Sequence, residues 1–90
     1  FPLVEKDLSL LVDNNITWEE IESVVKPMVK EIIFIEEYRG DKIPEDKRSI
    51  TIRVKIGNND STMTTEQITS KVGGILKVLG KKLNIVLREE

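Results

Sequence analysis

Cysteine and histidine are both absent from this 90-residue chain. Without cysteine there is neither a disulfide framework nor thiolate chemistry. Without histidine the chain lacks the commonest general base at neutral pH and the commonest metal ligand, so neither a Ser-His nor a Cys-His nucleophile can be built. We therefore expect a domain without catalytic residues, without a metal site and without a cofactor of its own.

Long hydrophobic runs are absent as well. The most apolar stretches, at 8–12 and 31–35, are far shorter than the ~20 residues that a transmembrane helix needs. A hydrophobic content of 39% and a charged content of 33% are typical of a soluble globular domain with one modest core. Because the chain opens on Phe1-Pro2 and not on Met, we expect residues 1–90 to be one domain excerpted from a longer cytoplasmic protein.

A strong excess of positive charge is also missing, since the formal net charge is −2. This argues against a free-standing nucleic-acid binder driven by charge, but not against a local contact inside a larger complex. Residues 39–55 hold six basic side chains and three acidic ones, which gives this segment a charge of +3. Such a segment could hold a phosphate backbone or could be an ordinary solvated loop, and the sequence leaves both readings open.

Two similar phrases, ITWEEI at 16–21 and MTTEQI at 63–68, predict two helix starts. In each phrase, the threonine hydroxyl can accept a hydrogen bond from the backbone amide three residues later. The Glu or Gln side chain at that later position can in turn accept a hydrogen bond from the backbone amide of the threonine. The flanking apolar residues stand where a hydrophobic staple forms. We expect helices over 18–30 and 65–80.

Proline and glycine residues should affect the length and the stability of these two helices. Pro27 should bend or shorten the last turn of the first helix, because it has no amide donor. Gly73-Gly74 would be costly in the middle of the second helix, and a close approach to the sheet would compensate. Gly80 is expected just past that helix's end.

Four strands are expected around the helices, at 4–13, 31–38, 48–56 and 83–88. The third alternates most clearly between apolar and polar residues. The order of strand, helix, strand, strand, helix, strand is that of the ferredoxin-like α+β fold, βαββαβ. Right-handed crossovers then place both helices on one face of a four-stranded antiparallel sheet. The other face is left open.

Side-chain alternation predicts which residues reach this open face. If Ile50, Ile52, Val54 and Ile56 face the helices, then Ser49 and Arg53 face away from them. Burying Ile33 and Ile35 on the second strand leaves Ile32, Phe34, Glu36 and Tyr38 open. Asp7 comes from the first strand, and Asn84, Val86 and Arg88 from the last. Aromatic rings, hydroxyls and charges in one sheet are typical of surfaces that stack and read unpaired RNA bases.

Four segments of the chain resemble one known domain in order and spacing: FPLVEKDLSLLVD at 1–13, YRGDKIPEDKRSITIRV at 38–54, STMTTEQI at 61–68 and LNIVLR at 83–88. The domain is the ferredoxin-fold anticodon-binding domain at the C-terminus of the bacterial phenylalanyl-tRNA synthetase β subunit. The resemblance covers essentially the whole chain. It implies a module that binds the anticodon stem-loop of phenylalanine tRNA with its open sheet face.

The same resemblance implies roles for particular residues. Glu36 and Ser49 match the acidic residue and the serine that meet the first anticodon base, a guanine. Tyr38, Lys47, Arg48 and Arg53 would be supporting contacts. Asp7, which matches the family's first-strand Asp, and Phe34, which strand alternation places on the open face, are further predicted contacts. For Asp7, a structural role in tying down the strand remains an equal alternative. The family usually has Asp where this chain has Glu36, which is one methylene longer.

The resemblance also implies partners. Aminoacylation would belong to the parent enzyme, which uses ATP and Mg²⁺ elsewhere in its assembly of β and α subunits. An alternative of another class is a regulatory or dimerisation module that binds a small ligand or a protein through the exposed edge at 31–35. A hydrolase resembling acylphosphatase is disfavoured, because DNNITW at 13–18 offers no loop that could cradle a phosphate.

Overall fold

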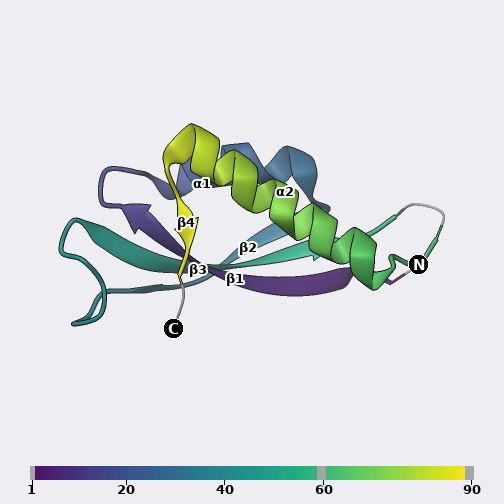
Figure 1. Ribbon diagram of the computed structural model, residues 1–90, viewed down its shortest axis with the longest axis horizontal. Coiled ribbons are helices and arrows are strands. Elements are labelled where there is room, and N and C mark those ends of the chain that lie inside the picture. The colour runs from purple at the N-terminus through teal and green to yellow at the C-terminus, as the bar shows by residue number, and fades with distance from the viewer. Residues whose placement is uncertain (1, 59–60, 89–90) are drawn as a thin grey trace.

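The computed structural model describes residues 2–58 and 61–88 as an antiparallel sheet with two helices on one face (Figure 1). Its elements, in chain order, are β1 (Val4–Asp13), α1 (Trp18–Val25), the short 3₁₀ helix η1 (Lys26–Met28), β2 (Glu31–Tyr38), β3 (Lys47–Ile56), α2 (Thr65–Leu83) and β4 (Val86–Leu87). The strand order is β2-β3-β1-β4. The predicted ferredoxin-like fold is confirmed. Among the described residues, none of the helices could span a lipid bilayer.

The helix starts follow the repeated phrases. At α1 the Thr17 hydroxyl accepts a hydrogen bond of 3.1 Å from the Glu20 backbone amide. At α2 the bonds run in both directions between Thr64 and Gln67, at 3.1 and 2.9 Å, which completes the capping box. Pro27 lies in η1, so the α-helical part of the first helix is shorter than predicted, as the missing amide donor requires.

The end of α2 differs from the prediction. The helix runs through Gly80 to Leu83, and Asn84 ends it with a φ of 56° in the left-handed region. Asparagine tolerates this region better than most residues. Because the longer helix takes up residues 81–83, the last strand is reduced to Val86–Leu87.

The expected approach of Gly73-Gly74 to the sheet is wrong. Gly73 is exposed, and a Cβ built on it would meet nothing within 4 Å outside its own helix. At Gly74 the nearest atom is Cε of Met28, at an ordinary contact distance of 3.9 Å. Neither glycine is therefore required for packing against the strands.

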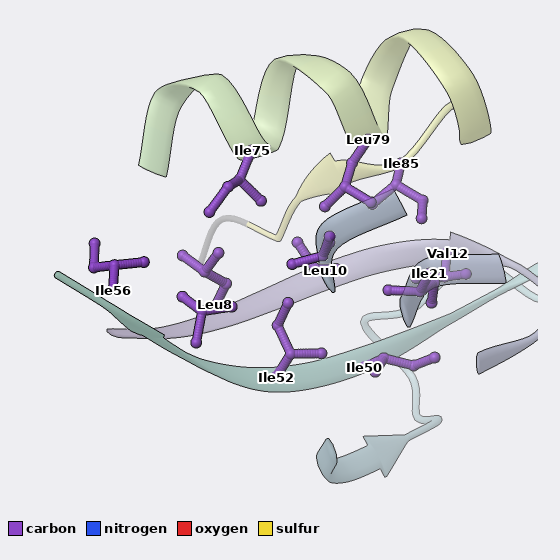
Figure 2. Packing of buried hydrophobic residues seen from close by; sticks show 12 residues of the cluster. Leu8, Leu10, Val12, Ile21, Ile50, Ile52, Ile56, Ile75, Leu79 and Ile85 are labelled. Atoms are coloured by element: carbon purple, nitrogen blue, oxygen red, sulfur yellow. The ribbon is translucent and has the colours of Figure 1, made fainter. Parts of the chain in front are cut away.

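The hydrophobic core lies between the sheet and the helices. Figure 2 shows Ile75 and Leu79 of α2 directed toward the sheet, where Leu8 and Leu10 of β1 stand. The buried members of this cluster are Leu8, Leu10, Val12, Ile21, Val25, Ile50, Ile52, Val54, Ile56, Ile75, Leu79 and Ile85. Each such side chain contributes roughly 1.5–3 kcal/mol through burial. The even-numbered residues of β3 therefore face the helices as predicted, and the odd-numbered ones face the open side.

A β-bulge in β2 breaks the alternation that the sequence predicts. Phe34 pairs with Ile52, but Glu36 pairs with Thr51, so Ile35 is one residue extra. Phe34 consequently lies on the helix-covered side, where its ring meets the Trp18 ring edge-on, with centroids 5.4 Å apart. The predicted placement of Phe34 on the open face is wrong. The same register puts Ile32 on the helix side and Ile33, opposite Arg53, on the open side.

Candidate functional site

The open face of the sheet is a stack of cross-strand pairs. Between β1 and β3 they are Asp7–Arg53, Ser9–Thr51, Leu11–Ser49 and Asp13–Lys47. On the outer side of β3, Thr51 is opposite Glu36 and Ser49 is opposite Tyr38. On the outer side of β1, Val86 of β4 is opposite Leu11. The face therefore has a charged end at Asp7, a hydroxyl-lined middle and a mixed end around Ser49.

Glu36 and Ser49 are diagonal neighbours on this face. Glu36 is opposite Thr51, and Ser49 stands two residues along the same strand. Diagonal positions in an antiparallel pair lie roughly 7–8 Å apart, within reach of one planar ligand. Glu36 is exposed, so its carboxylate can accept hydrogen bonds from a ligand without displacing any part of the core. The bulge makes this possible, since unbroken alternation from Phe34 would turn Glu36 toward the helices.

Ser49 lies on the open face and yet is only 2% exposed. Two side chains meet around it: Tyr38 is its partner across the ladder, and Nη1 of Arg88 lies 3.5 Å from its hydroxyl oxygen. The guanidinium carbon of Arg88 is also 5.3 Å from the centroid of the Tyr38 ring, which is a cation–π contact. The backbone amide of Arg88 donates to the Ser9 carbonyl at 2.7 Å, and this hydrogen bond holds the backbone of Arg88 beside β1.

Asp7 and Arg53 neutralise each other at the charged end. Nε of Arg53 donates to Oδ1 of Asp7 at 2.8 Å, and Nη2 donates to Oδ2 at 3.1 Å. These bonds to Arg53, with its positive charge, hold the pKa of Asp7 below its ordinary value, and the same contacts raise the pKa of Arg53. The pair ties β1 to β3, which is the structural role left open for Asp7.

Lys47 forms a similar pair at the other end of the ladder. Its Nζ donates to Oδ1 of Asp13 at 2.6 Å, and this hydrogen bond raises the pKa of Lys47. Lys47 remains on the open face, a quarter exposed, next to the loop of residues 39–46. It can still present positive charge to an anion, although Asp13 offsets part of that charge.

Arg48 is not on the open face. It is only 7% exposed, and its Nη atoms donate to the carbonyls of Asp13 and Ile16 at the start of the first crossover. Its Nε lies 2.6 Å from Oε1 of Glu37, which the bulge has turned to the helix side. The predicted contact of Arg48 with RNA does not fit this burial, whereas a structural tie between β3, α1 and β2 does.

The structure thus brings Glu36, Tyr38 and Ser49 together, places Lys47 and Arg53 toward the two ends of the face, and removes Phe34 and Arg48 to the other side. Arg88 was absent from the predicted contacts, although strand alternation already put it on this face. Within residues 2–58 and 61–88 there is no cluster of three or more acidic side chains that could hold a metal ion.

Comparisons with known proteins agree with this architecture. The model of the family described as ferredoxin-fold anticodon binding domain matches residues 1–88. The phenylalanine–tRNA ligase beta subunit of Syntrophotalea carbinolica is 37% identical over 92 residues, which cover 98% of this chain and 11% of that protein. The same subunit of Legionella pneumophila is 34% identical and that of Geobacillus kaustophilus 30%, over 99% and 98% of this chain and 12% and 11% of theirs. The chain spans about a ninth of the length of these relatives.

Proposed function

Because the chain belongs to the ferredoxin-fold anticodon-binding domain family, we propose that its open sheet face binds the anticodon stem-loop of phenylalanine tRNA. The domain would act within the β subunit of a phenylalanyl-tRNA synthetase in the cytoplasm, with the α subunit as a further partner. ATP and Mg²⁺ would be used by the parent enzyme elsewhere. The part of the reaction assigned to this chain is recognition of the tRNA.

One observation supports the proposal most directly: Glu36 and Ser49 are diagonal neighbours on the open face, beside the ring of Tyr38. A carboxylate can accept both the N1–H and an N2–H of guanine, in charge-assisted hydrogen bonds that adenine cannot match. A hydroxyl can bond a further base atom, and an aromatic ring can stack on the base. These three side chains suit a guanine at the first anticodon position.

Access to Ser49 requires Arg88 to turn aside. The contact from Arg88 to the Ser49 hydroxyl is 3.5 Å, at the long limit of a hydrogen bond, so this bond contributes little to the cost of turning Arg88 aside. The cation–π contact of Arg88 with Tyr38 is lost in the same movement. The released guanidinium would lie near the bound strand, where it could pair with a phosphate. Lys47 and Arg53 are secondary contacts in this proposal, because each already faces a carboxylate of β1.

A titration at low salt tests the proposal. The chain is mixed with an anticodon stem-loop of phenylalanine tRNA and, separately, with one in which adenine replaces the first anticodon guanine. We expect the guanine form to bind about tenfold more tightly, since a good bidentate pair is worth roughly 1–3 kcal/mol. Affinity for both should fall steeply with added salt, because phosphates are neutralised.

Glu36→Gln and Glu37→Gln form a matched pair of variants. Both remove one negative charge from the same strand end, but only Glu36 lies on the open face. Glu36→Gln should abolish the preference for guanine, whereas Glu37→Gln should keep it. Equal affinity of the unaltered chain for the two stem-loops would contradict the recognition proposal. If the two variants change the preference for guanine equally, Glu36 has no specific role in recognising guanine.

A further inference from the structure

Gly40 leaves room for the ring of Tyr38. A Cβ built on Gly40 would lie 2.2 Å from the hydroxyl oxygen of Tyr38 and 2.6 Å from its Cζ. Carbon atoms do not approach that closely, so the ring fills the space that any side chain at position 40 would need. The backbone does not explain the glycine, because no glycine in the described part of the chain has a positive φ. Gly40 therefore serves to leave room for the Tyr38 ring.

The loop that carries Gly40 is fastened at several points. The Ile43 amide donates to the Gly40 carbonyl at 2.9 Å, and the Ile43 side chain is buried. The side-chain amide of Asn14 donates to the Glu45 carbonyl at 2.9 Å, and Arg39 donates to Oδ1 of Asn14 at 2.8 Å. A tyrosine side chain can turn about χ1, whereas this loop is bonded at both ends. A side chain at position 40 would therefore displace the Tyr38 ring before it displaced the loop.

The place of the ring matters for the open face. Tyr38 is opposite Ser49 in the ladder and holds Arg88 over it by the cation–π contact. Tyr38 as a whole is 46% exposed, so part of this residue is available to a ligand. If the ring turns away, the site loses its border at Ser49 and with it the aromatic surface on which a base could stack.

We propose that Gly40 is a positioning residue of the RNA-binding face: the absence of a side chain at position 40 sets the ring of Tyr38 where an RNA base can stack beside Ser49. The inference rests on the proposed function and adds to it a residue that does not touch the RNA. Gly40 acts only through Tyr38.

Gly40→Ala and Gly73→Ala are the matched variants for the test. Both add one methyl group, but at Gly73 it would meet nothing within 4 Å outside its own helix. We expect Gly40→Ala to bind the phenylalanine anticodon stem-loop about tenfold more weakly, as expected when one base loses an aromatic stacking partner. Gly73→Ala should bind like the unaltered chain.

Two further measurements separate positioning from damage to the fold. Tyr38 is the only tyrosine in the chain, so its ring signals in an NMR spectrum can be followed without ambiguity. These signals should move in Gly40→Ala and not in Gly73→Ala. In a Tyr38→Ala background, adding Gly40→Ala should change the affinity by less than about twofold, since the ring through which it acts is gone.

The outcomes distinguish this inference from the function on which it rests. If the unaltered chain fails to bind the stem-loop, the proposed function itself is contradicted. If it binds and Gly40→Ala binds equally well, only the positioning role of Gly40 is overturned. The same holds if Gly40→Ala weakens binding as much without Tyr38 as with it, because Gly40 would then act through the loop.

Discussion

At the scale of single residues, Arg48 shows how burial changes the role of a cation. Its guanidinium bonds two backbone carbonyls, those of Asp13 and Ile16, and the carboxylate of Glu37. Arginine suits this position because its planar group carries five N–H donors and can satisfy several acceptors at once. The residue therefore joins the end of β2 to the turn between β1 and α1, and these contacts occupy its guanidinium.

Replacing Arg48 should cost more stability than replacing its ion-pair partner. Arg48→Ala removes the side-chain donor to the Ile16 carbonyl and one of two donors to the Asp13 carbonyl, which keeps the Ile16 amide. It also leaves the Glu37 carboxylate without its ion-pair partner, and we expect a loss of about 2–3 kcal/mol in the free energy of unfolding. Glu37→Gln keeps both carbonyl bonds and removes a half-exposed charge, so its loss should be about 1 kcal/mol or less. Urea denaturation of the two variants measures the difference. Equal losses would mean that the carbonyl bonds contribute little.

Gly73 is a residue whose replacement should help. It is exposed inside α2, and alanine has the higher helix propensity by about 1 kcal/mol. We expect Gly73→Ala to raise the free energy of unfolding by about that amount in thermal or urea denaturation. Gly80→Ala should gain less, because its Cβ would lie 3.4 Å from the Ile85 carbonyl. A loss of stability in Gly73→Ala would show a packing role for this glycine.

At the scale of elements, the bulge at Ile35 lets one strand serve both sides of the sheet. Before it, Ile32 and Phe34 lie on the helix side, where Ile32 packs against the core and Phe34 against Trp18. After it, Glu36 and Tyr38 lie on the open side. A single extra residue reverses the facing of everything that follows, because side chains alternate with a period of two. The placement of Glu36 and Tyr38 on the open face consequently depends on the bulge.

The helix caps allow a test at the same scale. Thr64 accepts the Gln67 amide at the start of α2, and replacing such a residue by alanine costs about 1 kcal/mol. Thr64→Ala should lower the free energy of unfolding by about that amount. Thr69→Ala, at an exposed position inside the same helix, should be neutral or slightly stabilising, since alanine favours the helix. A similar loss in both variants would argue against the capping role.

At the scale of the whole molecule, we expect an ion pair across the strands to contribute to the acid dependence of folding. Arg53 bonds Asp7 and lies 3.8 Å from Glu5, while Lys55 bonds Glu31 at 3.0 Å, so β1, β2 and β3 are joined on the open face. The pKa of Asp7 lies below its ordinary value through its hydrogen bonds with Arg53. Its contribution to stability is therefore present above the unfolded pKa and is lost as the pH falls through the folded one.

Removing either partner should flatten this acid dependence. Between about pH 5 and about pH 2, the free energy of unfolding should fall less steeply in Asp7→Asn than in the unaltered chain. Arg53→Gln should flatten it as well, and the double variant should add little, because the shift belongs to the pair. Urea denaturation at several pH values gives the slopes. An unchanged slope in Asp7→Asn would show that the pair has no influence on folding.

The sequence by itself determined the strand and helix order, both helix starts and the core face of β3. These features rest on local physics: capping, proline chemistry and alternation along a strand whose two faces differ clearly in polarity. The same alternation was enough to place Ser49 and Arg53 on the open side of β3. The family followed from motifs in the order and spacing that this fold requires.

Only the tertiary structure decided which side of the sheet each residue of β2 takes and which cations stay accessible. Residues 32–35 are apolar on both faces, so nothing in their pattern marks Ile35 as the extra residue. Its position follows from pairing with β3, a partner distant in sequence. The burial of Arg48 and the cover that Arg88 places over Ser49 also arise from segments brought together by folding. Alternation is a property of one strand, whereas register and burial belong to the assembled sheet.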